Sequence, residues 1–144
     1  MPYFGFFKTR LKHIAALSDF SPDQCGDAQS LYLEALVLDN ANDFENAIKK
    51  YSAALKIVPV FWEALDNRGL CHMKLHDFTA AIESFELSTQ INSESPLALV
   101  ALIKCYRENI QNVNAMHVAQ YCTQKWPDKS PFPNWEPLLG SSCA

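Results

Sequence analysis

Apolar residues in the middle of the chain recur at spacings of three and four, a pattern that predicts amphipathic helices. Residues 31–38 show this spacing first. The break at residues 40–43 carries turn-forming residues, and Asp43 is suited to cap the next helix. Pro59 ends that second helix, because the residue before a proline is pushed out of the α region. The whole pattern predicts helices near residues 5–18, 28–40, 44–57, 62–75, 78–91, 96–108 and 112–125.

The same pattern repeats every 34 residues. Each period holds two helices separated by a turn, so each is expected to fold as a helix–turn–helix hairpin. The shift aligns Leu31 with Leu65, Ala35 with Gly69, Asp43-Phe44 with Asp77-Phe78, Ala47-Ile48 with Ala81-Ile82, and Tyr51 with Phe85. A second, weaker shift aligns Leu99 with Leu65, Cys105 with Cys71, and Ala115 with Ala81.

This hairpin resembles the tetratricopeptide repeat, a 34-residue unit with small and aromatic residues at fixed places. The positions that carry the resemblance are Leu31, Ala35, Leu38, Ala47, Tyr51 and Pro59 in the first unit, Leu65, Gly69, Ala81 and Phe85 in the second, and Leu99, Leu102, Tyr106, Ala115 and Pro127 in the third. The sequence departs from the family pattern at Ser93, Ile103 and Ala119. The resemblance implies an all-α fold, a right-handed α-solenoid of three helix–turn–helix hairpins.

The repeat divides the chain into five segments. Residues 1–27 are expected to form an N-terminal amphipathic capping helix and a connector, and residues 130–144 a tail rich in proline and aromatic residues. Three repeats lie between them, at 28–61, 62–95 and, in degenerate form, 96–129. The first segment is expected to cap the first hairpin. A basic amphipathic helix also suits an anionic membrane surface, so a weak membrane contact through residues 1–20 is the alternative.

Composition and charge exclude several classes of function. The 144 residues carry 12 Lys+Arg against 16 Asp+Glu, a net charge of −4, which argues against a nucleic-acid-binding protein. Four glycines and no phosphate-binding motif argue against a nucleotide site. No apolar run reaches the roughly 18–20 residues of a membrane span, so no integral membrane segment is expected. Five cysteines without a C-x-x-C pair or a signal peptide favour a cytoplasmic protein with reduced thiols.

The chain shows no constellation of catalytic or metal-binding residues. Cys71 and Cys105 occupy equivalent positions in the repeat and are interpreted as small core residues. His72 and His76 have the spacing of a metal-binding pair on a helix, but His76 falls in the turn and no third ligand accompanies them. We therefore expect no enzyme activity, no cofactor and no metal.

The resemblance implies that the first helix of each hairpin lines a concave groove that binds a protein or peptide partner. Leucines on such a face would hold apolar anchors, with polar registration by Asn67, Lys104 and Arg107. One branch of the family grips carboxylate ends through a Lys, Asn and Arg clamp, of which only Asn67 is present here. The candidate partner-binding residues are Tyr32, Leu33, Leu36, Asp39, Glu63, Asp66, Asn67, Leu70, Met73, Leu97, Val100, Ala101, Lys104 and Arg107.

The function that these observations favour is a non-enzymatic protein–protein interaction module, an adaptor or scaffold that binds a peptide segment in its groove. A small secretion-type chaperone, similar in size, acidity and three-repeat layout, is the alternative. A membrane-peripheral adaptor that uses the N-terminal helix is a third hypothesis. The proline-rich tail is a further candidate occupant of the groove, where it would compete with partners.

Overall fold

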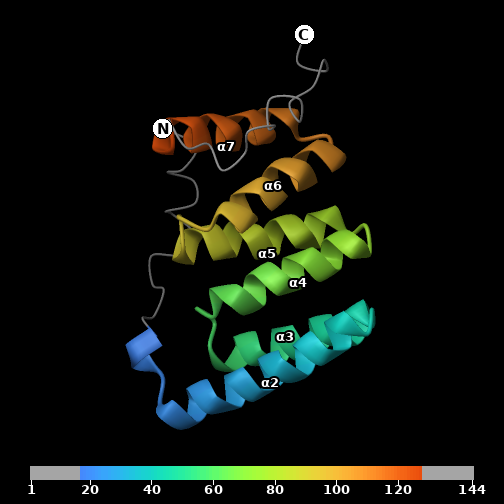
Figure 1. Cartoon of the computed structure of the whole chain (residues 1–144), viewed down its shortest axis with the longest axis vertical. Helices are drawn as coiled ribbons and strands as arrows, with labels where there is room; N and C mark the ends of the chain where they lie inside the picture. The colour runs from blue at the N-terminus through green and yellow to red at the C-terminus, as the bar shows by residue number, and fades with distance from the viewer. Residues whose placement is uncertain (1–16, 128–144) are drawn as a thin grey trace.

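The computed structural model describes residues 17–127, which form helices in series after a short 3-10 turn, η1 (Leu17–Asp19) (Figure 1). No β-strand occurs within this range, so the all-α prediction is confirmed. From residue 44 onward, each helix begins and ends within one residue of its predicted range. The helices are α2 (Pro22–Asn40), α3 (Phe44–Ile57), α4 (Trp62–Lys74), α5 (Phe78–Ile91), α6 (Pro96–Glu108) and α7 (Asn112–Lys125).

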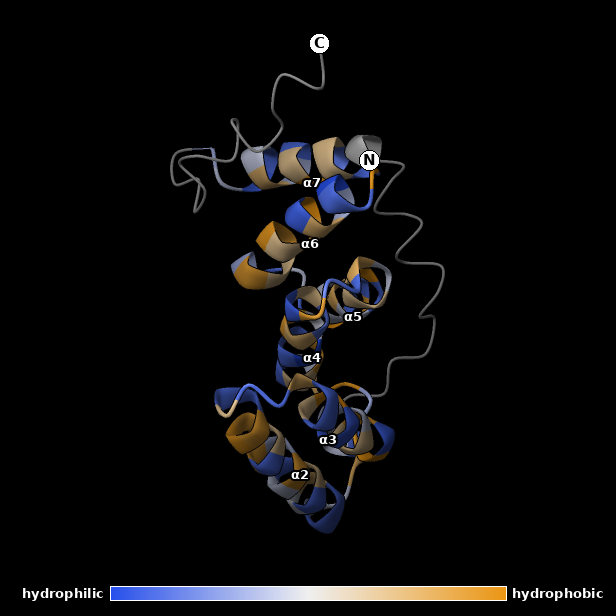
Figure 2. Cartoon of the chain, turned by 90° about the vertical axis from the view of Figure 1, so that its right-hand side faces the viewer, coloured by the Kyte–Doolittle hydropathy of each residue, from blue (hydrophilic) through white to orange (hydrophobic). Residues whose placement is uncertain are grey.

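Consecutive helices pack against each other along the whole stack, which makes the array a solenoid. The first hairpin is α2 and α3, the second is α4 and α5, and the third is α6 and α7. The second helix of one hairpin also packs on the first helix of the next, and α4 contacts α6 directly. As a result α3 and α5 lie on one side of the stack, while α2, α4 and α6 lie on the other (Figure 2).

The turn inside each hairpin has the same backbone geometry. Its central residue is in the left-handed region in all three hairpins, with φ of 61° at Asn42, 59° at His76 and 57° at Ile110. The N–H groups of residues 43, 77 and 111 donate to the carbonyl oxygens of residues 38, 72 and 106, respectively. The prediction that His76 lies in a turn is confirmed. The third turn keeps this geometry although its sequence departs from the other two.

Aromatic residues fill the space between the two helices of a hairpin and the next hairpin. Tyr51 and Phe85, which the 34-residue shift aligns, are both fully buried. A Cβ atom at Gly69 would lie only 2.7–2.9 Å from the ring atoms of Phe85. Because Cβ atoms essentially never approach so closely, a larger residue at position 69 would require the Phe85 ring to shift.

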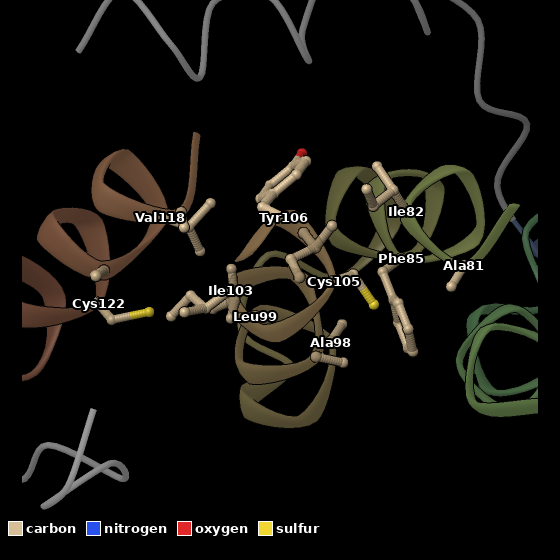
Figure 3. Packing of buried hydrophobic residues seen from close by; sticks show 14 residues of the cluster. Ala81, Ile82, Phe85, Ala98, Leu99, Ile103, Cys105, Tyr106, Val118 and Cys122 are labelled. Atoms are coloured by element: carbon tan, nitrogen blue, oxygen red, sulfur yellow. The ribbon is translucent and has the colours of Figure 1, made fainter. Parts of the chain in front are cut away.

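The third hairpin packs with the sizes of these two positions exchanged. Ile103 stands where the second hairpin has Gly69, and Ala119 stands where it has Phe85. Both residues are buried in one apolar cluster that joins α5, α6 and α7. Leu99 and Ile103 point from α6 toward Val118 and Cys122 of α7, whereas Ala98 and Cys105 point toward Phe85 of α5 (Figure 3).

The buried thiols contribute to this packing. Cys71, Cys105 and Cys122 are buried and free, which confirms the interpretation of Cys71 and Cys105 as small core residues. Burial raises the pKa of Cys71 and Cys105 to about 12 and that of Cys122 to about 11. Thiols with such values stay protonated near neutral pH, so they are poor nucleophiles.

The start of α2 corrects one prediction. The helix begins at Pro22, whereas the apolar pattern predicted a start near residue 28 and a connector up to residue 27. Ser21 and Gln24 form a capping box: the Gln24 N–H donates to Ser21 Oγ at 3.1 Å, and the Ser21 N–H donates to Gln24 Oε1 at 2.9 Å. Pro22 fits the first helical position because its missing N–H would have no partner there.

Two predicted segments lie outside the described residues. One is the capping helix predicted near residues 5–18, of which only residues 17 and 18 are described, as part of η1. The other is the tail at 130–144.

Candidate protein-binding face

The predicted partner-binding residues all lie on α2, α4 and α6, the first helices of the three hairpins. We call the surface that these three helices form the first-helix face (Figure 2). Its accessible surface depends on how neighbouring first helices approach each other. Two contacts between first helices determine this accessibility, and we call each a seam: one lies between α2 and α4, and the other between α4 and α6.

A hydrogen bond between Tyr32 and Asn67 joins α2 to α4. Asn67 Nδ2 donates to the Tyr32 hydroxyl at 2.9 Å. The Tyr32 ring packs at 4.8 Å from that of Phe61 and 5.8 Å from that of Tyr51, between ring centroids. Partial burial raises the pKa of Tyr32. Both polar groups are therefore used in holding the first two hairpins together.

An ion pair closes the same seam at the other end of α2. Lys74 Nζ lies 3.2 Å from Asp39 Oδ1, and the Tyr51 hydroxyl donates to Asp39 Oδ2 at 3.4 Å. The Lys74 ammonium also lies 4.7 Å from the centroid of the Phe44 ring. Burial, together with the Asp39 carboxylate, raises the pKa of Tyr51. The charge of Asp39 is thus balanced within the molecule.

The seam between α4 and α6 is closed more tightly. Ser95 Oγ donates to Asp66 Oδ2 at 3.3 Å and accepts from the Ala98 N–H at 3.4 Å, so one side chain caps α6 and ties it to α4. Asp66 is buried, and burial raises its pKa. Ala101 is also buried, in the cluster of the third hairpin. Asp66 and Ala101 are therefore not part of the accessible surface of the first-helix face, in contrast to the other predicted residues.

The remaining candidates keep accessible surface to different extents. Leu33 and Leu97 are the most open apolar side chains among them, at 52% and 46% exposed. Lys104 is exposed as well. Leu36 packs against the buried cluster of α2, α3 and α4 that contains Ala35 and Tyr51. Leu70 and Met73 pack against the buried cluster of α5, α6 and α7. The half-buried candidates are Tyr32, Leu36, Asp39, Glu63, Asn67, Leu70, Met73, Val100 and Arg107.

On α6 the accessible candidates form one stripe. Leu97, Val100, Lys104 and Arg107 follow each other at spacings of three, four and three residues, which places them along one face of the helix. Two apolar side chains at the N-terminal half of the stripe are followed by two cations at the C-terminal half. The stripe therefore combines accessible apolar surface with positive charge along one face of α6.

On α2, the sequence analysis did not predict the exposure of Val37. Val37 is 69% exposed on α2, although its equivalents Cys71 and Cys105 are fully buried. The 34-residue repeat could have identified Val37. It aligns Val37 with Cys71 and Cys105, and an apolar residue at a position that is buried in the other hairpins is expected to pack against another segment. The structure shows that no residue within 17–127 covers the Val37 side chain in this way.

The described residues show neither a metal cluster nor a membrane span. Within residues 17–127, no group of three or more His, Cys, Asp and Glu side chains is placed to hold a metal ion. His72 Nδ1 lies 3.9 Å from Asp77 Oδ2, and the ring of His76 packs against that of Phe78. None of the described helices is long and apolar enough to cross a membrane.

Three comparisons place the chain among known proteins. Residues 63–95 match the model of the tetratricopeptide repeat family, which confirms the resemblance in the second hairpin. The chain is 32% identical over 81 residues to a BBSome complex member BBS4 homolog of Drosophila melanogaster; the match covers 56% of this chain and 17% of that protein's length. It also resembles a chain in the crystal structure of a T3SS complex from Aeromonas hydrophila, with a TM-score of 0.61 and 20% identity. That likeness covers 84% of this chain and 81% of the other, and it shows the fold alone.

Proposed function

We propose that this chain, which carries a tetratricopeptide repeat at residues 63–95, is a non-enzymatic protein–protein interaction module that binds a segment of a partner through its first-helix face. The α6 stripe is the observation that carries the proposal. Leu97 is 46% exposed, and exposed apolar surface bordered by polar or charged residues is typical of an interface. A cytoplasmic location accords with free thiols at Cys71, Cys105 and Cys122.

The stripe also indicates which partner segment it would bind. Leu97 and Arg107 lie ten residues apart on α6, about 15 Å along the helix axis. An extended peptide covers that distance in about four to five residues. The apolar pair and the cation pair are centred about seven residues apart, about 10 Å along the axis. The favoured segment therefore has an apolar side chain for Leu97 and Val100 and, about three residues away, a carboxylate for Lys104 and Arg107. Asn67 supports the face through Tyr32.

A displayed peptide library tests this proposal directly. Selected peptides are expected to combine an apolar residue with Asp or Glu at about that spacing. Leu97→Asp is expected to weaken the best peptide at least about tenfold in calorimetry, because it places a charge against the apolar anchor. Lys104→Glu is expected to shift selection from acidic to basic peptides.

Met116→Asp is the matched control, because Met116 is exposed on α7 away from the stripe. It is expected to leave the affinity unchanged. The proposal fails if Leu97→Asp binds the selected peptide as tightly as the unsubstituted chain, or if Met116→Asp weakens it equally.

The comparisons favour two forms of this function. The name of the Drosophila relative describes a member of a multi-protein complex, which supports a role as an adaptor subunit. The structural neighbour comes from a T3SS complex, which supports the alternative of a small secretion-type chaperone. A chaperone is expected to form a stoichiometric complex with the product of a neighbouring gene on co-expression. An adaptor subunit is expected to elute with several proteins encoded elsewhere.

A membrane-peripheral adaptor remains the third form. It depends on residues 1–20, of which the structure describes only Leu17 to Phe20. Vesicle flotation with and without residues 1–20 tests it, and equal flotation of the two chains would exclude it.

A further inference from the structure

One edge of α2 is exposed although the same edge is buried in α4 and α6. Ser30 is exposed, whereas its equivalents Ala64 and Ala98 are fully buried. Val37 is 69% exposed, whereas Cys71 and Cys105 are fully buried. In the second and third hairpins this edge lies against α3 and α5, the second helix of the preceding hairpin. We call Ser30, Leu33, Glu34 and Val37 the α2 edge.

We propose that residues 1–16 of this same chain cover the α2 edge, with the aromatic residues near the N-terminus lying on Leu33 and Val37. This inference goes beyond the proposed partner binding, because it concerns the opposite end of the stack from the α6 stripe. It assigns Leu33 to contact within the chain. The segment holds four aromatic residues among its first seven, namely Tyr3, Phe4, Phe6 and Phe7.

The length of the segment and its point of attachment fit this site. The segment ends at residue 16, directly before η1, and α2 begins six residues later at Pro22. A helix that runs back antiparallel to α2 from that point rises 1.5 Å per residue, as α2 does. Phe7 then lies level with about residue 31 of α2, and Phe4 with about residue 34. The aromatic residues therefore reach Leu33 and Val37, and a more extended chain reaches them with residues to spare.

The charges of the two segments are complementary. Helix α2 contains neither Lys nor Arg. Its Glu34 and Asp39 pair with Lys50 and Lys74 of other helices, which leaves the exposed Asp23 and Asp27. Residues 1–16 contain Lys8, Arg10 and Lys12 and neither Asp nor Glu. In the antiparallel arrangement the three cations lie level with the N-terminal half of α2, where Asp23 and Asp27 are exposed. Covering the acidic α2 with this cationic segment brings opposite charges together. Covering it with a second copy of the chain, whose net charge is −4, would bring like charges together.

Attachment to α2 also gives the segment an advantage over any separate molecule. A short tether holds it near the α2 edge at an effective concentration of about millimolar. A second copy of the chain or a membrane must compete with that concentration.

Cysteine labelling tests the proposal at one atom. Val37→Cys introduces the residue that the second and third hairpins already have at this position, so the fold is expected to tolerate it. The rate of reaction with N-ethylmaleimide is measured at residue 37 by peptide mapping, in the full chain and in a chain without residues 1–16. The full chain is expected to react about tenfold more slowly, because the segment must open first. Met116→Cys, exposed on α7, is the control and is expected to react equally in both chains.

A second variant avoids the deletion. Phe4→Asp with Phe7→Asp in the full chain is expected to raise the labelling rate at residue 37 as the deletion does. Lys8→Glu with Lys12→Glu is expected to raise it part of the way.

Three outcomes would overturn the proposal. Equal labelling rates with and without residues 1–16 would show that the segment does not cover the edge. Protection that increases with protein concentration would assign the edge to a second copy. Protection that appears only with vesicles of phosphatidylserine and phosphatidylcholine would assign the segment to a membrane surface.

Discussion

The second and third hairpins have helices of the same lengths and the same turn geometry, but they fill the space between the helices in opposite ways. In the second, Gly69 on the first helix receives the ring of Phe85 from the second helix. In the third, Ile103 supplies the bulk and Ala119 leaves room for it. The stack thus constrains the sum of the two volumes and the register of the helices rather than the residue at either position. The match to the family model covers residues 63–95, within the hairpin that has the glycine–aromatic pair.

The largest expected effect comes from converting one pair into the other. Phe85→Ala alone is expected to lower the free energy of unfolding by about 3–5 kcal/mol, because it opens a cavity beside Gly69. Gly69→Ile alone is expected to cost about 1–3 kcal/mol through overpacking against the ring. In the double variant, which reproduces the third hairpin, the cost is expected to fall below that of Phe85→Ala. Urea denaturation of the three variants gives the coupling, and strictly additive costs would contradict the exchange of volume.

The second effect concerns the turn residue in the left-handed region. Asn42 accepts this conformation readily, whereas Ile110, with φ of 57° and 87% exposed, is β-branched. Ile110→Asn is expected to raise the free energy of unfolding by about 1 kcal/mol. The reverse change, Asn42→Ile, should lower it by a similar amount, as thermal and urea denaturation can measure. A neutral result for both variants would show that these turns carry no strain.

A smaller effect is expected at the helix cap that follows the turn. The Asp77 side chain accepts from the Ala80 N–H at 3.2 Å, whereas the Gln111 side chain accepts no hydrogen bond from the backbone of α7. Gln111→Asp is expected to stabilise the chain by about 0.5–1 kcal/mol, and Asp77→Ala to destabilise it by about 1 kcal/mol. Circular dichroism melting curves measure both. If Gln111→Asp leaves the melting temperature unchanged, the start of α7 does not limit stability.

The smallest expected effect is a change in pH dependence. Asp66 is buried on α4, whereas its equivalent on α6 is Val100. Because burial raises the pKa of Asp66, the folded state holds its proton to higher pH than the unfolded state does. Its contribution to stability is therefore present below the ordinary carboxyl pKa and is lost as pH rises through the folded-state pKa. Asp66→Asn is expected to remove that decline in urea midpoints measured from pH 4 upward, and an unchanged slope would assign it to other groups.

Sequence periodicity predicted most of the helix boundaries because every turn occurs at the same register. It failed at α2, where the apolar pattern starts at residue 28 but the cap formed by Ser21 and Gln24 extends the helix to Pro22. That capping signal lies in local polar residues, which the apolar pattern does not include.

The candidate site could be predicted only in part. Register assigns residues to α2, α4 and α6, but it does not determine how closely those helices approach. The contact between α4 and α6 buries Asp66 and Ala101, and the hydrogen bond from Asn67 engages Tyr32. The exposure of Val37 was not predicted because it depends on a missing neighbour. In the other hairpins this position packs on the second helix of the preceding hairpin, and within residues 17–127 no such helix precedes α2.

The close approach of Gly69 to Phe85 also constrains how such a repeat can diverge over generations. A lineage that enlarges residue 69 first must displace the Phe85 ring, since a Cβ at residue 69 would lie 2.7 Å from it. A lineage that shortens Phe85 first passes through a cavity, which lowers stability without forcing the helices apart. We therefore expect ancestral hairpins between the two forms to carry small residues at both positions. Related hairpins with a large aliphatic residue facing an aromatic one would contradict this order of substitution.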